Sequence, residues 1–342
     1  MTTDAVEAVP HARSNASRRG RRTPFGSAVT TWKAGAVRAL VVLLGSSLVL
    51  AGALPEGLRP ASAAESSAQG RAGGAMQIVA HEDDDLLFQS PDLLHDVQGG
   101  RSVRTVFLTT GDAAKGRAYW SSRERGSLAA YAKMAGVADS WAASDARVSG
   151  HSILMRTLTA APNISLVFMR LPDGNRRGTG MIRYGHQSLM RLWNGSIGSI
   201  AAVDGSAVYT SATLATTLTE LMTDFRPTTL RAQDWTVSFG TGDNADHTAA
   251  ALYTRLADQG YRSPHTMFAY AGYPSWVRDP NVTGVDLASK RAAFQAYALH
   301  DPMMCLKLWC AADVVASLRL AREYVTDSVP TTASTGRPPR SW

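Results

Sequence analysis

The sequence contains very little cysteine. Its 342 residues include only Cys305 and Cys310, which stand five apart in the stretch CLKLWC with no histidine beside them. This spacing is poor for a zinc knuckle, so we expect no metal site built on cysteine. In an exported chain the two thiols would form a small-loop disulfide, which we favour over the alternative of two free buried thiols.

Outside its N-terminal part, the chain also lacks an excess of charge of either sign. The net charge is +7, but residues 1–75 hold nine basic and four acidic residues, so the remainder carries only +2. A domain that binds nucleic acid usually shows a strongly basic face. We therefore expect no nucleic-acid partner.

Long apolar runs are rare, and the longest lies near the N-terminus. Residues 39–54 read ALVVLLGSSLVLAGAL, preceded by the basic stretch RRGRR and followed by the small residues ASAA at 61–64. The run is short for a membrane span and no stop-transfer pattern follows it. We predict a signal peptide over residues 1–64, a secreted mature protein and only transient membrane contact, with an uncleaved anchor as the alternative.

The rest of the chain reads as one domain between two irregular segments. Residues 65–74 are a small-residue linker, residues 75–325 form the folded domain, and residues 326–342 are rich in Ser, Thr and Pro and are predicted to be disordered. No internal repeat is visible. A hydrophobic content of 45% is ordinary for a globular protein with a core.

Within the domain, strand-like and helix-like patterns alternate. This alternation predicts an α/β fold with a mostly parallel sheet that is covered by helices on both faces. Sites in such folds lie at the carboxyl ends of the strands. The predicted strands cover residues 76–80, 104–110, 164–171, 228–233 and 265–271, and the predicted helices cover residues 121–137, 211–225, 247–261 and 287–299.

A histidine and four acids follow the first predicted strand. The stretch QIVAHEDDDLLF places His81 and the acidic residues 82–85 directly after the apolar run Ile78-Val79-Ala80. Clustered carboxylates repel one another and are costly to desolvate, so packing does not explain them. A metal ion does, because a histidine and a carboxylate three residues apart can converge on one ion if the chain curls.

A third ligand has to come from elsewhere in the chain. The best candidate is the stretch GDNADHTAAALY, where Asp243, Asp246 and His247 stand at the start of a predicted helix. A zinc ion bound by nitrogen and oxygen ligands, with one position open for water, is typical of hydrolases.

These stretches together resemble the PIG-L/LmbE family of zinc-dependent N-deacetylases. AHEDDD resembles the family's A-H-P-D-D motif, and DNADH resembles its H-x-D-H motif. Further similarities are TTGD after the second predicted strand, the helix YWSSRERGSLAAYAKMAGV, and RLPDG at residues 170–174. The resemblance covers most of residues 75–300 and implies a Rossmann-like LmbE fold.

The resemblance also implies roles for individual residues. His81, Asp84 and His247 match the metal ligands, and Asp83 matches the carboxylate that serves as general base toward water. One zinc ion per chain is expected, although iron, cobalt or manganese would also accept two histidines and one carboxylate.

Two positions depart from the family pattern. Glu82 replaces the proline of the first motif, which only stiffens the turn, and Asn244 replaces the first histidine of the second motif. That histidine is expected to stabilise the oxyanion or to donate a proton. Asparagine can donate a hydrogen bond but carries no proton at neutral pH, so either activity is lowered or the proton comes from another group.

Two further positions match substrate-binding residues of the family. Asp173 of LPDG matches a position that binds sugar hydroxyls, and Arg123 approximately matches a helix arginine. The alternatives are a turn residue before a glycine for Asp173 and a solvated helix face for Arg123.

The function implied is an exported, zinc-dependent hydrolase of amide bonds. It would remove an N-acetyl or related acyl group from an amino sugar, such as N-acetylglucosamine, in a small molecule or glycan. The pattern is most similar to the secreted and glycopeptide-antibiotic deacetylases of the family. The alternatives are an extracellular sugar-binding protein that retains the fold without catalysis, and a hydrolase of another acyl bond.

Overall fold

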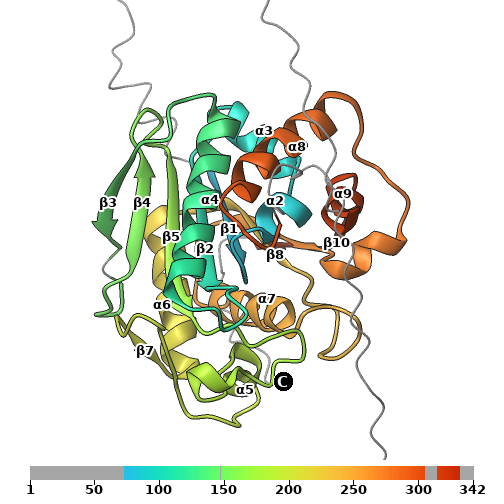
Figure 1. Ribbon diagram of the computed structural model, residues 1–342. Helices are drawn as coiled ribbons and strands as arrows, with labels where there is room; N and C mark the ends of the chain where they lie inside the picture. The colour runs from blue at the N-terminus through green and yellow to red at the C-terminus, as the bar shows by residue number, and fades with distance from the viewer. Residues whose placement is uncertain (1–72, 147, 305–313, 332–342) are drawn as a thin grey trace, which may run out of the picture. The chain divides into compact units, whose positions relative to one another are not determined.

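A computed structural model of the protein describes residues 73–146, 148–304 and 314–331 (Figure 1). The predicted signal peptide, residues 65–72 of the predicted linker, Cys305 and Cys310 lie outside these residues. Within the described ranges, no helix is both long enough and apolar enough to cross a membrane.

The main sheet has eight strands among the described residues. In chain order they are β1 (Gly74–Val79), β2 (Val103–Thr109), β3 (Trp141–Asp145), β4 (Leu154–Leu158), β5 (Ile164–Leu171), β8 (Pro227–Gln233), β9 (His265–Tyr270) and β10 (Val325–Thr331). Across the sheet the order is β10-β9-β8-β1-β2-β5-β4-β3. The five strands from β9 to β5 pair in parallel, and antiparallel strands close both edges. This arrangement confirms the predicted α/β fold with a mainly parallel sheet.

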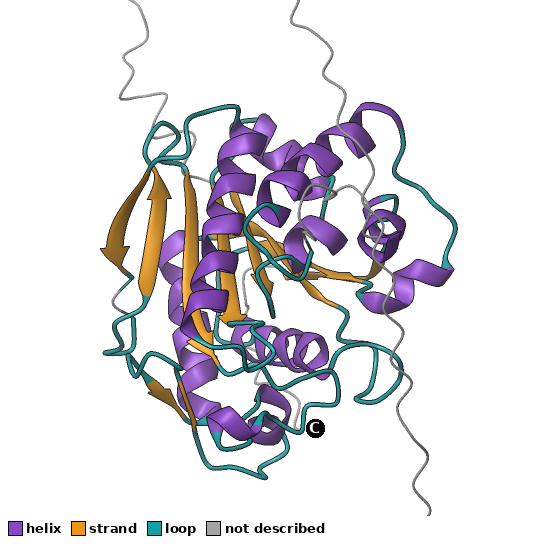
Figure 2. Ribbon diagram, in the orientation of Figure 1, coloured by secondary structure: helices purple, strands orange, loops and turns teal. Residues whose placement is uncertain are grey.

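Helices cover both faces of this sheet (Figure 2). On one face α6 and α7 pack against the central strands, and on the other α2, α3, α4 and α8 do so. The bounds are α2 (Asp84–Phe88), α3 (Asp92–Gln98), α4 (Arg117–Ala135), α5 (Leu189–Trp193), α6 (Ser211–Phe225), α7 (Ala245–Asp258), α8 (Gly284–Ala298) and α9 (Val314–Leu320); short 3₁₀ turns are η1 (Ile182–Tyr184) and η2 (Tyr273–Val277), and a small ribbon joins β6 (Ile200–Ala201) to β7 (Val208–Tyr209).

Strand β1 shows why the core is divided into two layers. Successive side chains of a strand point to opposite faces of the sheet. Met76 and Ile78 therefore belong to the hydrophobic cluster that contains α6 and α7, whereas Val79 belongs to the cluster that contains α4 and α8. Burial on both faces produces the continuous apolar run by which the strand was predicted.

Most predicted elements are present with small shifts at their ends. Helix α6 has the predicted bounds, and a capping box formed by Thr210 and Thr213 fixes where it begins. Helix α7 begins at Ala245, two residues before its predicted start.

The prediction of a disordered tail from residue 326 is wrong for residues 326–331. These residues belong to β10, which pairs antiparallel with β9 at the edge of the sheet. The strand has few apolar side chains. It is held by backbone hydrogen bonds to β9 and by side-chain contacts, such as the hydrogen bond that Trp235 Nε1 donates to Asp327 Oδ2 at 2.8 Å. Residues 332–342 lie outside the described part of the chain.

Candidate metal-dependent active site

The segment after β1 curls back on itself immediately. His81 follows the carboxyl end of the strand, and its backbone N–H donates to Asp84 Oδ2 at 2.7 Å. Asp83 occupies the N-cap position of α2, so that Asp84 stands in the first turn of that helix. The curl required for His81 and Asp84 to converge is therefore present.

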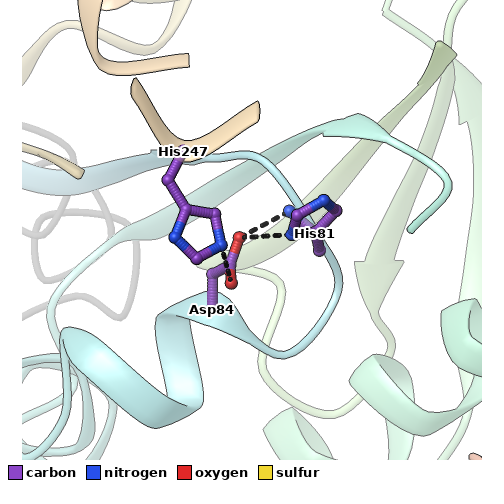
Figure 3. Close-up of side chains that lie close together, drawn as sticks. All are labelled: His81, Asp84 and His247. Atoms are coloured by element: carbon purple, nitrogen blue, oxygen red, sulfur yellow. Dashed lines mark hydrogen bonds and ion pairs between the residues drawn. The ribbon is translucent and has the colours of Figure 1, made fainter. Parts of the chain in front are cut away.

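His247 reaches the same point from the first turn of α7. Its Nε2 lies 3.0 Å from Asp84 Oδ1, while His81 Nδ1 lies 3.2 Å from Asp84 Oδ2 (Figure 3). The three side chains are buried, and one ligand atom from each lies within 4.8 Å of the other two. Figure 3 shows the Asp84 carboxylate between the two imidazole rings.

The hydrogen bonds of His247 test whether these residues fit a metal ion. Its Nδ1 lies 2.8 Å from Asp243 Oδ1, an acceptor that, in the neutral ring, places the proton on Nδ1 and leaves a lone pair on Nε2. Nε2 is buried, has no hydrogen-bond partner among the described residues, and faces the Asp84 oxygen. Nε2 and Asp84 Oδ1, 3.0 Å apart, need a cation between them, which is either a proton on Nε2 or a metal ion, so the donor set fits a metal ion.

The carboxylates around His81 and His247 favour the positively charged form of both imidazoles. Burial opposes a charged imidazole, yet the nearby carboxylates outweigh it and raise the pKa of both His81 and His247 well above the usual value. For Asp84, burial is likewise outweighed by the two histidines, which hold its pKa well below the usual range. The site is therefore built around an anionic Asp84 that favours positive charge beside it.

Two further side chains orient the groups of the site, Asp246, which stands in the DNADH stretch, and Gln233, which sequence reasoning did not assign to the site. Gln233, the last residue of β8, donates from Nε2 to Asp84 Oδ2 at 2.7 Å and accepts from Ala80 N at 3.1 Å. On the other side, Asp246 Oδ2 lies 3.4 Å from His81 Nε2 and accepts from Gly174 N at 2.8 Å. Only the position of Gln233 at the carboxyl end of a predicted strand could have indicated its role.

Asp83 lies at the edge of this centre and is held by one arginine. Arg123 Nη2 donates to Asp83 Oδ1 at 2.5 Å. Burial raises the pKa of Asp83, while the positive charge of Arg123 acts to lower it. The carboxylate that the resemblance assigns as general base is therefore fixed in orientation but not bound between the two histidines.

Arg123 itself is buried, with 5% of its surface exposed. Its guanidinium also donates to the Gly111 carbonyl, and its Nε donates to Tyr297 Oη at 2.6 Å and lies 3.2 Å from Asp301 Oδ2. The resemblance implied contact with substrate, and the alternative was a solvated helix face. The burial of the side chain excludes the solvated helix face, while its contact with substrate stays a prediction.

Asn244 caps helix α7 beside the metal ligands. Its Oδ1 accepts from Asp246 N at 2.9 Å, the usual interaction of an N-cap asparagine. Its Nδ2 has no hydrogen-bond partner among the described residues and stays available as a donor. The asparagine thus combines a structural role through its oxygen with a free N–H₂ group near the site.

Asp173 uses both carboxylate oxygens within the protein. Oδ2 accepts from Ala113 N at 2.8 Å, and Oδ1 accepts from Asn175 N at 2.7 Å. The second bond is that of a turn residue, the alternative considered from the sequence, and the first joins the turn to residues 110–116. Asp173 also lies within the group formed with His81 and Asp246, so it is near the centre.

Comparisons with known proteins are consistent with this arrangement. The model of the family described as "PIG-L: GlcNAc-PI de-N-acetylase" matches residues 76–257, which is more than half of the chain and includes every candidate ligand. A search of curated protein sequences finds no match.

Solved structures show only distant similarity. N,N'-diacetylchitobiose deacetylase from Pyrococcus horikoshii is 12% identical, with 66% of this chain and 70% of that chain covered and a TM-score of 0.37. The A40926 pseudoaglycone deacetylase Dbv21 is 15% identical, with 68% and 83% covered and a TM-score of 0.39. The 4-carboxy-2-hydroxymuconate hydratase GalB from Pseudomonas putida KT2440 is 12% identical, with 73% and 82% covered and a TM-score of 0.39. At these scores the structures carry no argument about the reaction.

Proposed function

Because the chain belongs to the PIG-L family, we propose that it is an exported, metal-dependent hydrolase that removes an acetyl or related acyl group from an amino sugar. The observation that carries this proposal is the convergence of His81, Asp84 and His247 on one point, with the buried Nε2 of His247 3.0 Å from Asp84 Oδ1. Asp83 lies beside them. A metal centre with an adjacent unbound carboxylate is one arrangement by which water can hydrolyse an amide.

His81, Asp84 and His247 would hold the ion, and zinc is the metal that suits them best. A bound zinc would polarise the amide carbonyl and make a water molecule more acidic. Asp243 and Asp246 support the ligands through the second nitrogen of each ring, a contact that fixes ring orientation.

Asp83 would take the proton from the attacking water. Its orientation is set by Arg123, so the carboxylate does not have to be ordered during the reaction. The same carboxyl group, once protonated, would return the proton to the amine that leaves. This return is needed because Asn244 cannot supply a proton at neutral pH.

Asn244 would act as a hydrogen-bond donor to the developing oxyanion. Its Oδ1 is held at the helix cap, which leaves Nδ2 directed away from the capped N–H. A fixed donor at such a point stabilises the charge that develops on the carbonyl oxygen. Asparagine in place of the family's histidine would therefore remove a general acid from the site but keep a hydrogen-bond donor.

Acetate release from N-acetylglucosamine-bearing substrates, measured with and without added zinc, tests the proposal. We expect zinc-dependent release that falls about 100-fold or more in Asp83→Asn, the usual contribution of a general base, while bound zinc is unchanged. Asp139→Asn, an exposed carboxylate, is the matched control. Tight zinc binding without release from any N-acetyl sugar would contradict the proposal and favour a binding protein or, if other amides or esters are cleaved, another acyl bond.

Export is part of the proposal and rests on the pattern of residues 1–64 alone. Sequencing of the N-terminus of the protein recovered from culture medium tests it. A mature chain that starts close to residue 64 is expected, and a protein that stays inside the cell with its first residues intact would contradict it.

A further inference from the structure

Helix α8 and the turn after it lie beyond the residues that the family model matches. The match ends at residue 257, whereas α8 covers Gly284–Ala298 and packs against α4 (Figure 1). Both helices contribute to the same hydrophobic cluster. Tyr297 and Asp301 carry polar groups and are nevertheless buried there, each with no more than 1% of its surface exposed. Buried polar groups are costly unless they are hydrogen-bonded, so the contacts of these two residues indicate their role.

Tyr297 joins Arg123 to Asp301. Its hydroxyl donates to Asp301 Oδ2 at 2.7 Å, and the same oxygen accepts from Arg123 Nε at 2.6 Å. A phenol has one proton to donate, so the bond to Asp301 turns the lone pairs of the oxygen toward the guanidinium group. Asp301 therefore makes Tyr297 an acceptor for Arg123.

Asp301 is itself held on both of its oxygens. Tyr119 Oη and Met303 N donate to Oδ1 at 2.7 and 2.9 Å, while Oδ2 lies 3.2 Å from Arg123 Nε. Tyr119 and Arg123 are four residues apart in α4, so they lie on one face of that helix. The carboxylate thus holds the turn after α8 against this face and places a negative charge beside the arginine.

Gly126 allows α4 and α8 to approach each other at this point. A Cβ added to Gly126 would lie 2.7 Å from Tyr297 Cδ2 and 2.8 Å from the Tyr297 carbonyl oxygen, so no side chain fits between the helices. Gly126 follows Arg123 by three residues and shares its face of α4. The close approach therefore occurs where Tyr297 meets Arg123.

These contacts fix the direction of the remaining guanidinium nitrogen. Nε of Arg123 is bonded to Tyr297, Nη1 donates to the Gly111 carbonyl, and Nη2 donates to Asp83 Oδ1 at 2.5 Å. Because the guanidinium group is planar and rigid, fixing Nε and Nη1 fixes where Nη2 points.

We propose that Tyr297 and Asp301 are positioning residues for the proposed reaction. They hold the plane of Arg123, and Arg123 holds Asp83 in the orientation that suits a general base. The inference rests on the proposed function, because Asp83 has this role only if the chain hydrolyses an acyl bond with water. It adds a requirement for chain that lies beyond the family match.

Steady-state kinetics of Tyr297→Phe tests the proposal. The variant keeps the ring between the helices and loses the acceptor for Arg123. We expect kcat for acetate release to fall about tenfold, as for other residues that orient a catalytic group, with KM and bound zinc unchanged. Asp301→Asn should act in the same direction. Tyr261→Phe is the matched control, since Tyr261 is buried and its hydroxyl donates to the Pro227 carbonyl at the amino end of β8, and its kcat should not change.

Two further variants separate positioning from a general loss of stability. Residues that act through a shared contact give non-additive effects. In the Arg123→Met background, below its unfolding temperature, Tyr297→Phe should therefore lower kcat no further. Gly126→Ala keeps every group of the network but displaces Tyr297, so it should also lower kcat, although alanine in place of glycine otherwise favours a helix.

Nitrogen NMR of isotopically labelled protein observes the contact without turnover. The Arg123 Nε–H signal, identified by its absence from Arg123→Met, should exchange slowly with water because the group is buried and hydrogen-bonded. In Tyr297→Phe we expect exchange to be about tenfold faster, in proportion to the lost hydrogen bond.

The proposal is wrong if kcat of Tyr297→Phe or Gly126→Ala stays at the original value, or if zinc is lost together with activity. It is also wrong if Tyr297→Phe lowers kcat equally in the Arg123→Met background, which would leave the tyrosine a packing role alone. If the protein releases no acetate but Tyr297→Phe still speeds exchange at Arg123, the proposed reaction fails while the placement of Arg123 by Tyr297 stands.

Discussion

Replacing Arg123 with methionine is the change with the largest expected effect outside the metal ligands. Arg123 lies against Asp83 at 2.5 Å, Glu82 at 3.4 Å and Asp301 at 3.2 Å, all of them buried. The variant removes the positive charge that lies against all three carboxyl groups, so none of them keeps Arg123 as its ion-pair partner. Burial already raises the pKa of Glu82 well above its usual value, and loss of the arginine removes the main opposing influence.

The size of the effect follows from this burial. Breaking a buried ion pair on one side costs about 3–5 kcal/mol, a large part of the roughly 5–15 kcal/mol by which a native domain is stable. For a domain of about 250 residues each kcal/mol corresponds to about 2–4 °C, so we expect the unfolding temperature to fall by about 6–20 °C. Acetate release should fall as well, because Asp83 loses the group that orients it.

Thermal unfolding followed by circular dichroism measures the change. Arg125→Met is the matched control, since Arg125 is exposed on the same helix, and its unfolding temperature should stay within about 2 °C of the original. Arg123→Lys keeps the charge but not the planar fork, so an intermediate unfolding temperature is expected. If Arg123→Met unfolds at the same temperature as Arg125→Met and still releases acetate, then the buried network does not support Asp83 and the reasoning fails.

Two further substitutions separate metal binding from capping. Asp243→Asn removes the acceptor that fixes the His247 ring, so zinc affinity measured by competition with a chelator should fall about 10–100-fold, and an unchanged affinity would contradict the role given to Asp243. Asn244→Ala should cost about 1 kcal/mol of stability through the lost cap. Asn244→Asp should keep the cap but lose the Nδ2 donor, so acetate release that stays at the original rate in this variant would refute the oxyanion role.

The parts of the fold that the sequence predicted are those with a local signal. Buried parallel strands such as β5 appear as continuous apolar runs, and α6 begins at its own capping residues. The edge strands gave no such signal. In β3 most side chains are exposed, and β10 contains Asp, Ser and Pro, so hydrogen bonds to a neighbouring strand, rather than their own side chains, make them strands.

The same distinction applies to the site. His81 and Asp84 are three residues apart and were found together, and the DNADH stretch indicated His247 through its likeness to a known motif. Gln233 and the network around Arg123 could not be predicted, because each depends on residues that are far apart in the chain. Asp301, which lies 3.2 Å from Arg123 Nε, becomes its neighbour only when α8 packs beside α4.

The two oxygens of Asp84 have consequences for which ions the centre can accept. Oδ2 already receives the backbone N–H of His81 and the amide of Gln233, so it is occupied on the protein side. Asp84 can therefore offer Oδ1 alone and cannot swing to chelate an ion with both oxygens. Calcium, which favours six to eight oxygen ligands and often a bidentate carboxylate, is poorly served by this centre. If the centre holds a metal ion, the hydrogen bonds that orient Asp84 would favour ions that take few ligands over calcium.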